Sequence, residues 1–271
     1  YDISVQFNPG RITSSAAKVD ARSIKARPCF LCERNRPPEQ RGIPFGNNYT
    51  ILINPFPIFH RHLTIVSRCH TPQRIAGSFD TMLSMAQALQ DYTVFYNGPQ
   101  CGASAPDHLH FQAGNRGFLP IEKDAENTSL CRAVAENNGT ELLLWIGYGR
   151  GIVTLRGSDG EALTGAFTRL YDRLAIKEPE RPEPMLNILA YHDEGRWTVH
   201  IIPRRVHRPR CYFAEGDSRI LLSPASVDLG GVFITPRGED FKKISAVDIA
   251  NILDEVCLKE EDLKTLTKDM L

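Results

Sequence analysis

The stretch DHLHFQAG, residues 107–114, places two histidines two residues apart and a glutamine two residues further on. Side chains alternate between the two faces of a β-strand, so on a strand His108, His110 and Gln112 all point to one face. Two imidazoles and an amide make a poor hydrophobic core, because buried polar groups need hydrogen-bond partners. They suit a site that handles phosphate. A metal pair or an ordinary polar strand face would give the same pattern, so the motif alone leaves these interpretations open.

The loop before this strand has the composition of a phosphate cradle. It reads GPQCGASAPD, residues 98–107, and the backbone N–H groups of such a loop can bind phosphate oxygens. A neutral imidazole can attack phosphorus and form a phosphoramidate when an acceptor holds its other ring nitrogen. Gln112 can donate a hydrogen bond to phosphate but cannot serve as a general acid or base. These residues therefore favour transfer of the phosphoryl-linked group to a second substrate over transfer to water.

The strand and helix patterns repeat along the chain. In the first half, two β-rich runs precede a helical pattern and two further strands, at 49–54, 61–67, 71–90, 93–98 and 108–114. In the second half, a hairpin, a helix and two strands are expected at 141–157, 159–175, 185–193 and 196–204. The shared order predicts an α+β fold built from a duplicated unit.

Composition divides the chain into three segments. Residues 1–28 show little periodicity and predict an extended N-terminal arm. Residues 29–135 form the half that carries the histidine motif, and we expect it to be catalytic. Residues 136–271 form a second, degenerate half that ends in a helix at 246–256.

Charge and cysteine content exclude several classes of protein. The 271 residues carry a formal net charge of zero, so a general nucleic-acid binder is not expected. No apolar run reaches transmembrane length, which predicts no membrane association. The seven cysteines are an odd number with one close pair, which argues against a disulfide scaffold and favours a cytoplasmic location. No signal peptide is visible, although the chain begins at Tyr1 and a leader could have been removed.

The pair Cys29-x-x-Cys32 is a candidate half of a zinc site. It could also be a redox pair, or two buried cysteines without a metal. No thioredoxin-like βαβ unit surrounds it, so a redox role is not favoured. Zinc needs two more ligands, and without a second CxxC motif histidines must supply them. His70 and His108 are the candidates, because both lie near strand ends of the same unit.

Basic and amide residues mark possible substrate contacts. The run IIPRRVHRPR, residues 201–210, contains Arg204, Arg205, Arg208 and Arg210. It is either a solvated basic edge or the binding site for inorganic phosphate or a sugar phosphate, since guanidinium groups match phosphate oxygens. Lys123 follows the histidine strand and could join such a site. Asn54 ends a strand before two prolines, and is either a turn residue or a contact for a ribose hydroxyl.

Taken together, these motifs resemble a known family. The segments CFLC, Asn54, HLTIVSRCH and N-G…S-x-P-x-H-x-H-x-Q resemble the galactose-1-phosphate uridylyltransferase branch of the histidine-triad (HIT-like) superfamily. The segments HLHFQA…LPIEK and W-x-V-x-x-IPR…P-x-CY resemble the GDP-hexose phosphorylases, and diadenosine tetraphosphate phosphorylases are close relatives of that group. The resemblance runs from about Cys29 to the C-terminus. It implies a HIT-like antiparallel sheet with flanking helices.

The resemblance assigns roles to the residues of the histidine strand and its surroundings. His110 matches the covalent nucleophile, Gln112 the phosphate-binding glutamine and His108 the first histidine of the motif. The zinc ligands of the uridylyltransferases match Cys29, Cys32, His70 and His108. The positions that match substrate contacts are Asn54, Asn97, Gly102 and Ser104, although the extra residue Asp107 separates Ser104 from His108. In the second half, His200 lies on the equivalent strand without an HxH pair.

The resemblance implies a nucleotidyltransferase that works by double displacement through a nucleotidyl-histidine intermediate. The donor is a nucleotide sugar or a dinucleotide. The acceptor is inorganic phosphate or a sugar phosphate, held by some of Arg204, Arg205, Arg208, Arg210 and Lys123. The alternatives are a HIT-like nucleotide hydrolase and a non-catalytic, zinc-stabilised nucleotide-binding protein. Relatives of this kind are often dimers, so a homodimer is possible.

Overall fold

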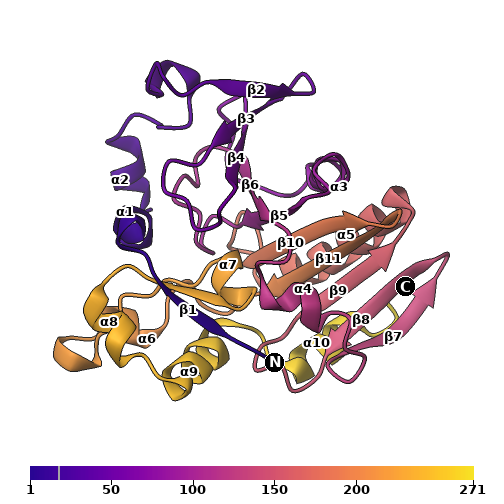
Figure 1. Ribbon diagram of the computed structural model, residues 1–271. Coiled ribbons are helices and arrows are strands. Elements are labelled where there is room, and N and C mark those ends of the chain that lie inside the picture. The colour runs from indigo at the N-terminus through magenta and orange to yellow at the C-terminus, as the bar shows by residue number, and fades with distance from the viewer. Residues whose placement is uncertain (18) are drawn as a thin grey trace.

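One ten-stranded antiparallel sheet organises the protein, of which the computed structural model describes residues 1–17 and 19–271 (Figure 1). The strand order is β2-β3-β4-β6-β5-β10-β11-β9-β8-β7, and each neighbouring pair is antiparallel. The strands are β2 (Gly42–Phe45), β3 (Tyr49–Ile53), β4 (His62–Ser67), β5 (Tyr92–Asn97), β6 (His110–Asn115), β7 (Cys131–Asn137), β8 (Thr140–Trp145), β9 (Val153–Gly157), β10 (Leu186–Asp193) and β11 (Arg196–Pro203). The expected α+β fold with an antiparallel sheet is confirmed.

The two halves of the sheet have the same topology. Strands β2-β3-β4-β6-β5 and β7-β8-β9-β11-β10 follow the same order, and they meet where β5 pairs with β10. A helix follows the third strand of each half, α3 (Phe79–Ala88) in the first and α5 (Gly160–Lys177) in the second. This repeat agrees with a duplicated unit. The segment boundaries at 28/29 and 135/136 stay predictions, and β7 spans the second of them.

Each face of the sheet carries its own hydrophobic core. On one face, α3 and α5 pack together through Phe79 and Phe167, whose rings stack with centroids 3.9 Å apart. On the other face, Phe95, Trp145 and Ile202 belong to a second core with residues from helices α7 (Ser226–Leu229) and α9 (Ala246–Val256), whereas α10 (Glu260–Thr267) packs in the first core. The remaining helices are η1 (Pro9–Arg11), α1 (Ile12–Ser15), α2 (Ala21–Lys25), η2 (Glu33–Asn35), α4 (Pro120–Asp124), α6 (Arg210–Phe213), η3 (Gly216–Ser218) and α8 (Gly238–Lys243).

The N-terminal segment crosses to the second half of the chain. Its strand β1 (Ser4–Phe7) pairs in parallel with β12 (Val232–Thr235), as Figure 1 shows. The short helices α1 and α2 follow, so the prediction of a wholly extended arm was wrong. The pairing brings residues 9–17 beside loops of the C-terminal part. None of the helices in the described part of the chain combines the length and apolar composition that crossing a membrane requires.

Candidate active site and metal centre

The backbone of β6 fixes the tautomer of His110. The ring Nδ1 of His110 lies 2.8 Å from the carbonyl oxygen of His108. A carbonyl can only accept, so Nδ1 carries the proton and Nε2 presents its lone pair. Burial lowers the pKa of His110 to about 4, so the imidazole is neutral near neutral pH. The structure thus gives His110 the form that a nucleophilic histidine needs.

Gln112, two residues further on the same face, is oriented by a second histidine. The amide N–H of Ile58 donates to Nδ1 of His62 at 3.1 Å, so Nε2 of His62 carries a proton. This Nε2–H donates to Oε1 of Gln112 at 3.0 Å. Among the described residues, no acceptor is within hydrogen-bond distance of the Gln112 NH₂ group, which lines a cavity. That NH₂ group is free to donate to a ligand.

His62 is a candidate site residue that the sequence did not identify. Its position at the start of a strand suggests only a structural side chain. The sequence does not show which of the histidines at 60 and 62 lies near the site. The structure buries His62 and leaves His60 exposed. Burial, aided by the charge of Arg11, lowers the pKa of His62 to about 3, so its ring stays neutral and keeps the hydrogen bond to Gln112.

Asn54 takes the role of a turn residue next to Gln112. Its Oδ1 accepts from the backbone N–H of Phe56 at 2.9 Å, and its Nδ2 donates to Oγ1 of Thr64 at 3.0 Å. The Nδ2 also lies 3.5 Å from Oε1 of Gln112. Asn54 therefore closes the proline corner and supports the glutamine, and its contact with a ribose stays a prediction.

A cavity opens in front of Gln112 and is built from three parts of the chain. The lining residues from the first half are Ile58, Phe95, Asn97, Gly102, Ala103 and Gln112; those from the N-terminal segment are Arg11, Ser14, Ser15, Ala17 and Val19; those from the second half are His207, Arg208, Ser223, Ala225, Val227, Asp228 and Ile234. The predicted contacts Asn97, Gly102 and Gln112 are thus brought together. Gly102 has φ +99°, and a Cβ there would lie 2.5 Å from Cβ of Ala225, so the loop needs glycine.

The arginine run divides into buried, exposed and cavity-lining members. Arg204 is buried, and all five of its N–H groups donate to the chain itself, to Val256, Asn187, Pro224, Val206 and His207. It therefore has no donor left for phosphate, and the prediction of an anion contact there was wrong. Arg205 and Arg210 line a different groove, beside α9.

Arg208 is the member of the run that reaches the cavity. Its Nε donates to Oγ of Ser223 at 3.1 Å and its Nη2 to the carbonyl of Ala17 at 3.0 Å. The ring of Tyr212 supports the guanidinium at 4.3 Å. Arg11 lines the same cavity from the N-terminal segment, and the sequence carried no signal for it, because its place depends on the pairing of β1 with β12.

Two predicted substrate contacts lie elsewhere. The carbonyl oxygen of Ser104 accepts from Nη2 of Arg27 at 3.1 Å, and Ser104 is not among the described residues that line the cavity. Lys123 is exposed on α4 and likewise does not line it. Their roles stay predictions without support from this arrangement.

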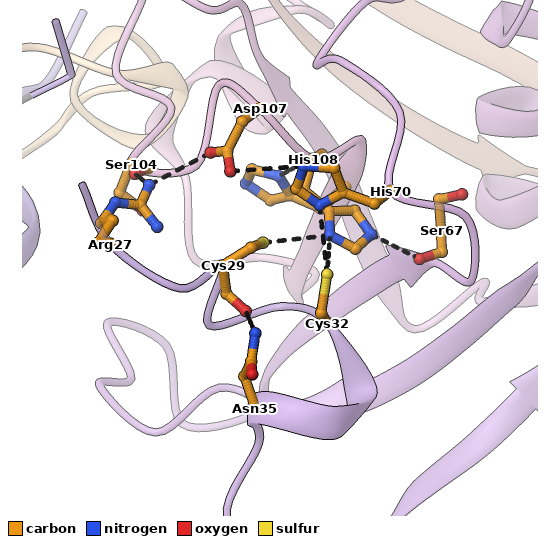
Figure 2. A network of polar contacts seen from close by, with 10 residues as sticks. Arg27, Cys29, Cys32, Asn35, Ser67, His70, Ser104, Asp107 and His108 are labelled. Carbon is orange, nitrogen blue, oxygen red and sulfur yellow. Dashed lines mark hydrogen bonds and ion pairs between the residues drawn. The ribbon is translucent and has the colours of Figure 1, made fainter. Parts of the chain in front are cut away.

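Four predicted metal ligands converge at the base of the histidine strand. One ligand atom each of Cys29, Cys32, His70 and His108 lies within 4.8 Å of all the others. The Nδ1 of His108 is 3.3 Å from Sγ of Cys29, and the Nδ1 of His70 is 3.2 Å from Sγ of Cys32 (Figure 2). Two thiols and two imidazoles are a donor set for a tetrahedral zinc site.

The surroundings of these side chains fit a metal. The Nε2–H of His108 donates to the carbonyl of Ser67 at 2.7 Å, so its Nδ1 lone pair faces the cysteines. The Nε2 of His70 lies 3.8 Å from a carboxylate oxygen of Asp107. Such outer acceptors are typical of metal-binding histidines. Burial and the neighbouring Cys29 raise the pKa of the Cys32 thiol, and a bound cation would remove this obstacle to thiolate formation.

Comparison with known proteins identifies a family and similar folds. The model of a family described as "GDPGP1-like, C-terminal domain" matches residues 124–271, and that of a domain of unknown function, DUF4922, matches residues 1–115. The structure of yeast Ap4A phosphorylase Apa2 is similar with a TM-score of 0.62 and 18% identity, over 87% of this chain and 83% of that chain. The complex of that enzyme with Ap4A gives a TM-score of 0.60, with 18% identity over 94% and 84% of the two chains.

One structure with a lower TM-score completes the comparison. An ADP-glucose phosphorylase from Arabidopsis thaliana with bound ADP-glucose has a TM-score of 0.42 and 16% identity, over 93% of this chain and 95% of that chain. No curated protein matches the chain at a significant level. The similarity to the Ap4A phosphorylase establishes the fold, and the family match agrees with the resemblance that the sequence motifs indicate.

Proposed function

The chain belongs to the GDPGP1-like family, and we propose on this premise that it is a nucleotidyltransferase that works by double displacement. The observation that carries the proposal is the paired orientation of two side chains on β6. His110 has a protonated Nδ1 held by a carbonyl and an unprotonated Nε2, and Gln112 directs a free NH₂ group into a cavity. A nucleophile beside a fixed donor for phosphate oxygen suits phosphoryl-linked group transfer.

In the first half-reaction, Nε2 of His110 attacks the α-phosphorus of the donor. The new P–N bond forms as the P–O bond to the leaving sugar phosphate or nucleotide breaks, and the electron pair leaves with that oxygen. The carbonyl of His108 accepts from Nδ1–H throughout and so stabilises the positive charge that develops on the ring. The NH₂ of Gln112 and the N–H groups of the glycine loop at Gly102 stabilise charge on the phosphoryl oxygens.

In the second half-reaction, an oxygen of the acceptor attacks the same phosphorus and the P–N bond breaks. His110 returns to its starting tautomer, because its Nδ1 proton never leaves. Glutamine in the Gln112 position has no acid or base function, which disfavours the activation of water. Inorganic phosphate or a sugar phosphate is therefore the proposed acceptor, and Arg208 is its proposed contact.

Zinc is the proposed structural metal of the cluster Cys29, Cys32, His70 and His108. A zinc ion bound there would hold the ring of His108 and so fix the residue whose carbonyl positions the nucleophile. It would not reach the transferred group, because the face that carries Nδ1 of His108 points toward the cysteines. The metal would supply stability and order.

The donor is proposed to be a nucleotide sugar or a dinucleotide. The family description favours a guanine nucleotide sugar, and the complex of the yeast phosphorylase with Ap4A makes a dinucleotide the second candidate. Intact-protein mass should be measured after brief mixing with GDP-, UDP- and ADP-sugars and Ap4A, without acceptor. An adduct of one nucleoside monophosphate, discharged by phosphate, is the expected result.

Two other outcomes of this experiment identify the alternatives. Release of nucleoside monophosphate without any acceptor would indicate a hydrolase. Tight nucleotide binding without an adduct for any donor, on protein that carries its metal, would indicate a non-catalytic binding protein.

Replacing Arg208 by methionine should slow discharge of the adduct by phosphate about 10- to 100-fold, since a hydrogen bond to a charged group is worth about 1.5–3 kcal/mol. Formation of the adduct should change little. Arg210 is the matched control, because its side chain is 94% exposed and pairs with Glu255 outside the cavity. The effect is measured by following the loss of the adduct with time after phosphate is added at a range of concentrations. Equal discharge rates for Arg208→Met and Arg210→Met would remove Arg208 from the proposed acceptor site.

A further inference from the structure

The pairing of β5 with β6 stops just before the nucleophile. The register runs from Tyr92↔Asn115 to Phe95↔Gln112, although β5 continues to Asn97 and β6 begins at His110. Two more steps of the same register would place Asn97 opposite His110. These two residues form no such pair, so the strands separate at the point where the proposed chemistry takes place.

The backbone groups of His110 face this gap. The neighbouring residue Leu109 points the other way, since its carbonyl accepts from the N–H of Ser67 in β4 at 3.0 Å. Successive residues of a strand direct their N–H and C=O groups to opposite edges. The N–H and C=O of His110 are therefore directed at β5 and need partners there.

The side chain of Gln73 fills the gap and supplies those partners. Its Oε1 accepts from the N–H of His110 at 2.8 Å, and its Nε2 donates to the carbonyl of His110 at 3.0 Å. The same Nε2 donates to the carbonyl of Asn97 at 3.0 Å. Gln73 is 0% exposed, so one buried amide acts as an extra peptide unit between the two strands.

The loop that carries Gln73 is itself held on both sides. The N–H of Gln73 donates to the carbonyl of Pro106, in the loop before the histidine strand, at 3.0 Å. Two residues later, the N–H of Ile75 donates to a carboxylate oxygen of Glu183 at 2.6 Å. Glu183 lies between α5 and β10, so the second half of the chain helps to hold the loop that places Gln73 between β5 and β6.

We infer that Gln73 is a positioning residue for His110: its amide keeps β5 and β6 apart and sets the angle at which the imidazole enters the site. The inference rests on the proposed function. A strand that closed onto β5 would move the His110 backbone and change the hydrogen bond of its Nδ1 with the carbonyl of His108. Misplacement of a reacting group by about 1 Å can cost roughly 100-fold in rate.

The test compares Gln73→Met, which removes all three hydrogen bonds at similar volume, with Gln73→Glu, which keeps the acceptor for the His110 N–H. Both variants should form the adduct about 10- to 100-fold more slowly in single-turnover mass measurements, with donor half-saturation within about threefold of wild type. In ¹⁵N NMR spectra of the imidazoles at neutral pH, His110 should lose its single Nδ1–H tautomer in Gln73→Met. Wild type and both variants are compared after zinc has been supplied to each of them.

The control is Trp197→Phe, which removes another buried hydrogen bond, from Nε1 of Trp197 to the carbonyl of Leu83 at 2.9 Å. It should lower thermal stability without changing the rate or the tautomer. Wild-type rates and tautomer in Gln73→Met would overturn the inference, and so would unfolding of both Gln73 variants, because the residue would then support the fold in general. If wild type forms no adduct with any donor, the proposed function fails. The NMR comparison of the His110 tautomer then decides by itself whether Gln73 positions His110.

Discussion

Replacing His110 with asparagine should abolish the covalent adduct and reduce turnover by at least about 1,000-fold, the scale on which loss of a covalent nucleophile acts. The asparagine amide cannot displace a leaving group at phosphorus. The fold should persist, because Gln73 supports the backbone of residue 110 and the ring of His108 contacts the cluster of candidate metal ligands. Neither of these contacts needs the imidazole of His110. Intact mass after mixing with donor, together with the thermal unfolding midpoint, measures both effects.

His60→Asn is the matched control for this substitution. His60 is exposed and lies just before β4, so it should keep wild-type adduct formation. Labelling of His110→Asn to the wild-type level would show that another residue is the nucleophile and would remove the foundation of the proposed mechanism.

Local sequence patterns predicted the elements that depend on neighbouring residues. The alternation in DHLHFQAG identified the strand β6 with His110 and Gln112, although the strand begins at His110 and His108 lies just before it. The CxxC pair with two histidines identified the cluster of candidate metal ligands. The helical pattern at 71–90 was too long, because Pro72 and the left-handed Gly77 hold the first residues outside α3. Alternation and the CxxC spacing are properties of neighbouring residues, so they can be recognised in the sequence without the fold.

Contacts between distant segments account for what the sequence did not predict. Arg11 reaches the cavity because β1 pairs with β12, more than 200 residues away in the chain, and no local pattern records that pairing. Arg204 and Arg208 have the same sequence context, yet one is buried among carbonyl groups and the other lines the cavity. Burial is decided by tertiary packing, so a charge run alone cannot separate its members.

The second half contributes to the site although it carries no second histidine motif. His200 on β11 is buried, its Nδ1 lies 2.8 Å from Oγ1 of Thr154, and burial lowers its pKa to about 3. Its half supplies Arg208 and Ser223 to the wall of the first half's cavity and Glu183 to the loop of Gln73. One half thus holds the proposed chemistry, and the other completes the site around it.

Removal of the proposed zinc should lower the stability of the fold more than any of the other changes considered above. The cluster joins the loop of Cys29 and Cys32 to the strand end at His108 and to His70 after β4, and within the described chain the buried core around Cys29 is small. A structural zinc contributes folding free energy directly. Chelation, or Cys29→Ser, should lower the unfolding midpoint by about 10 °C, the shift that roughly 3–4 kcal/mol gives in a chain of this size.

The same loss should slow the proposed chemistry, because His108 would no longer be held where its carbonyl accepts from Nδ1 of His110. Cys69→Ser is the control, since Cys69 is exposed, adjacent to His70 and outside the cluster. Native mass spectrometry should find one zinc in wild type and Cys69→Ser and none in Cys29→Ser. Equal midpoints for the two serine variants, with no metal in wild type, would leave the four residues as a hydrogen-bonded cluster and would require the backbone and Gln73 alone to position the nucleophile.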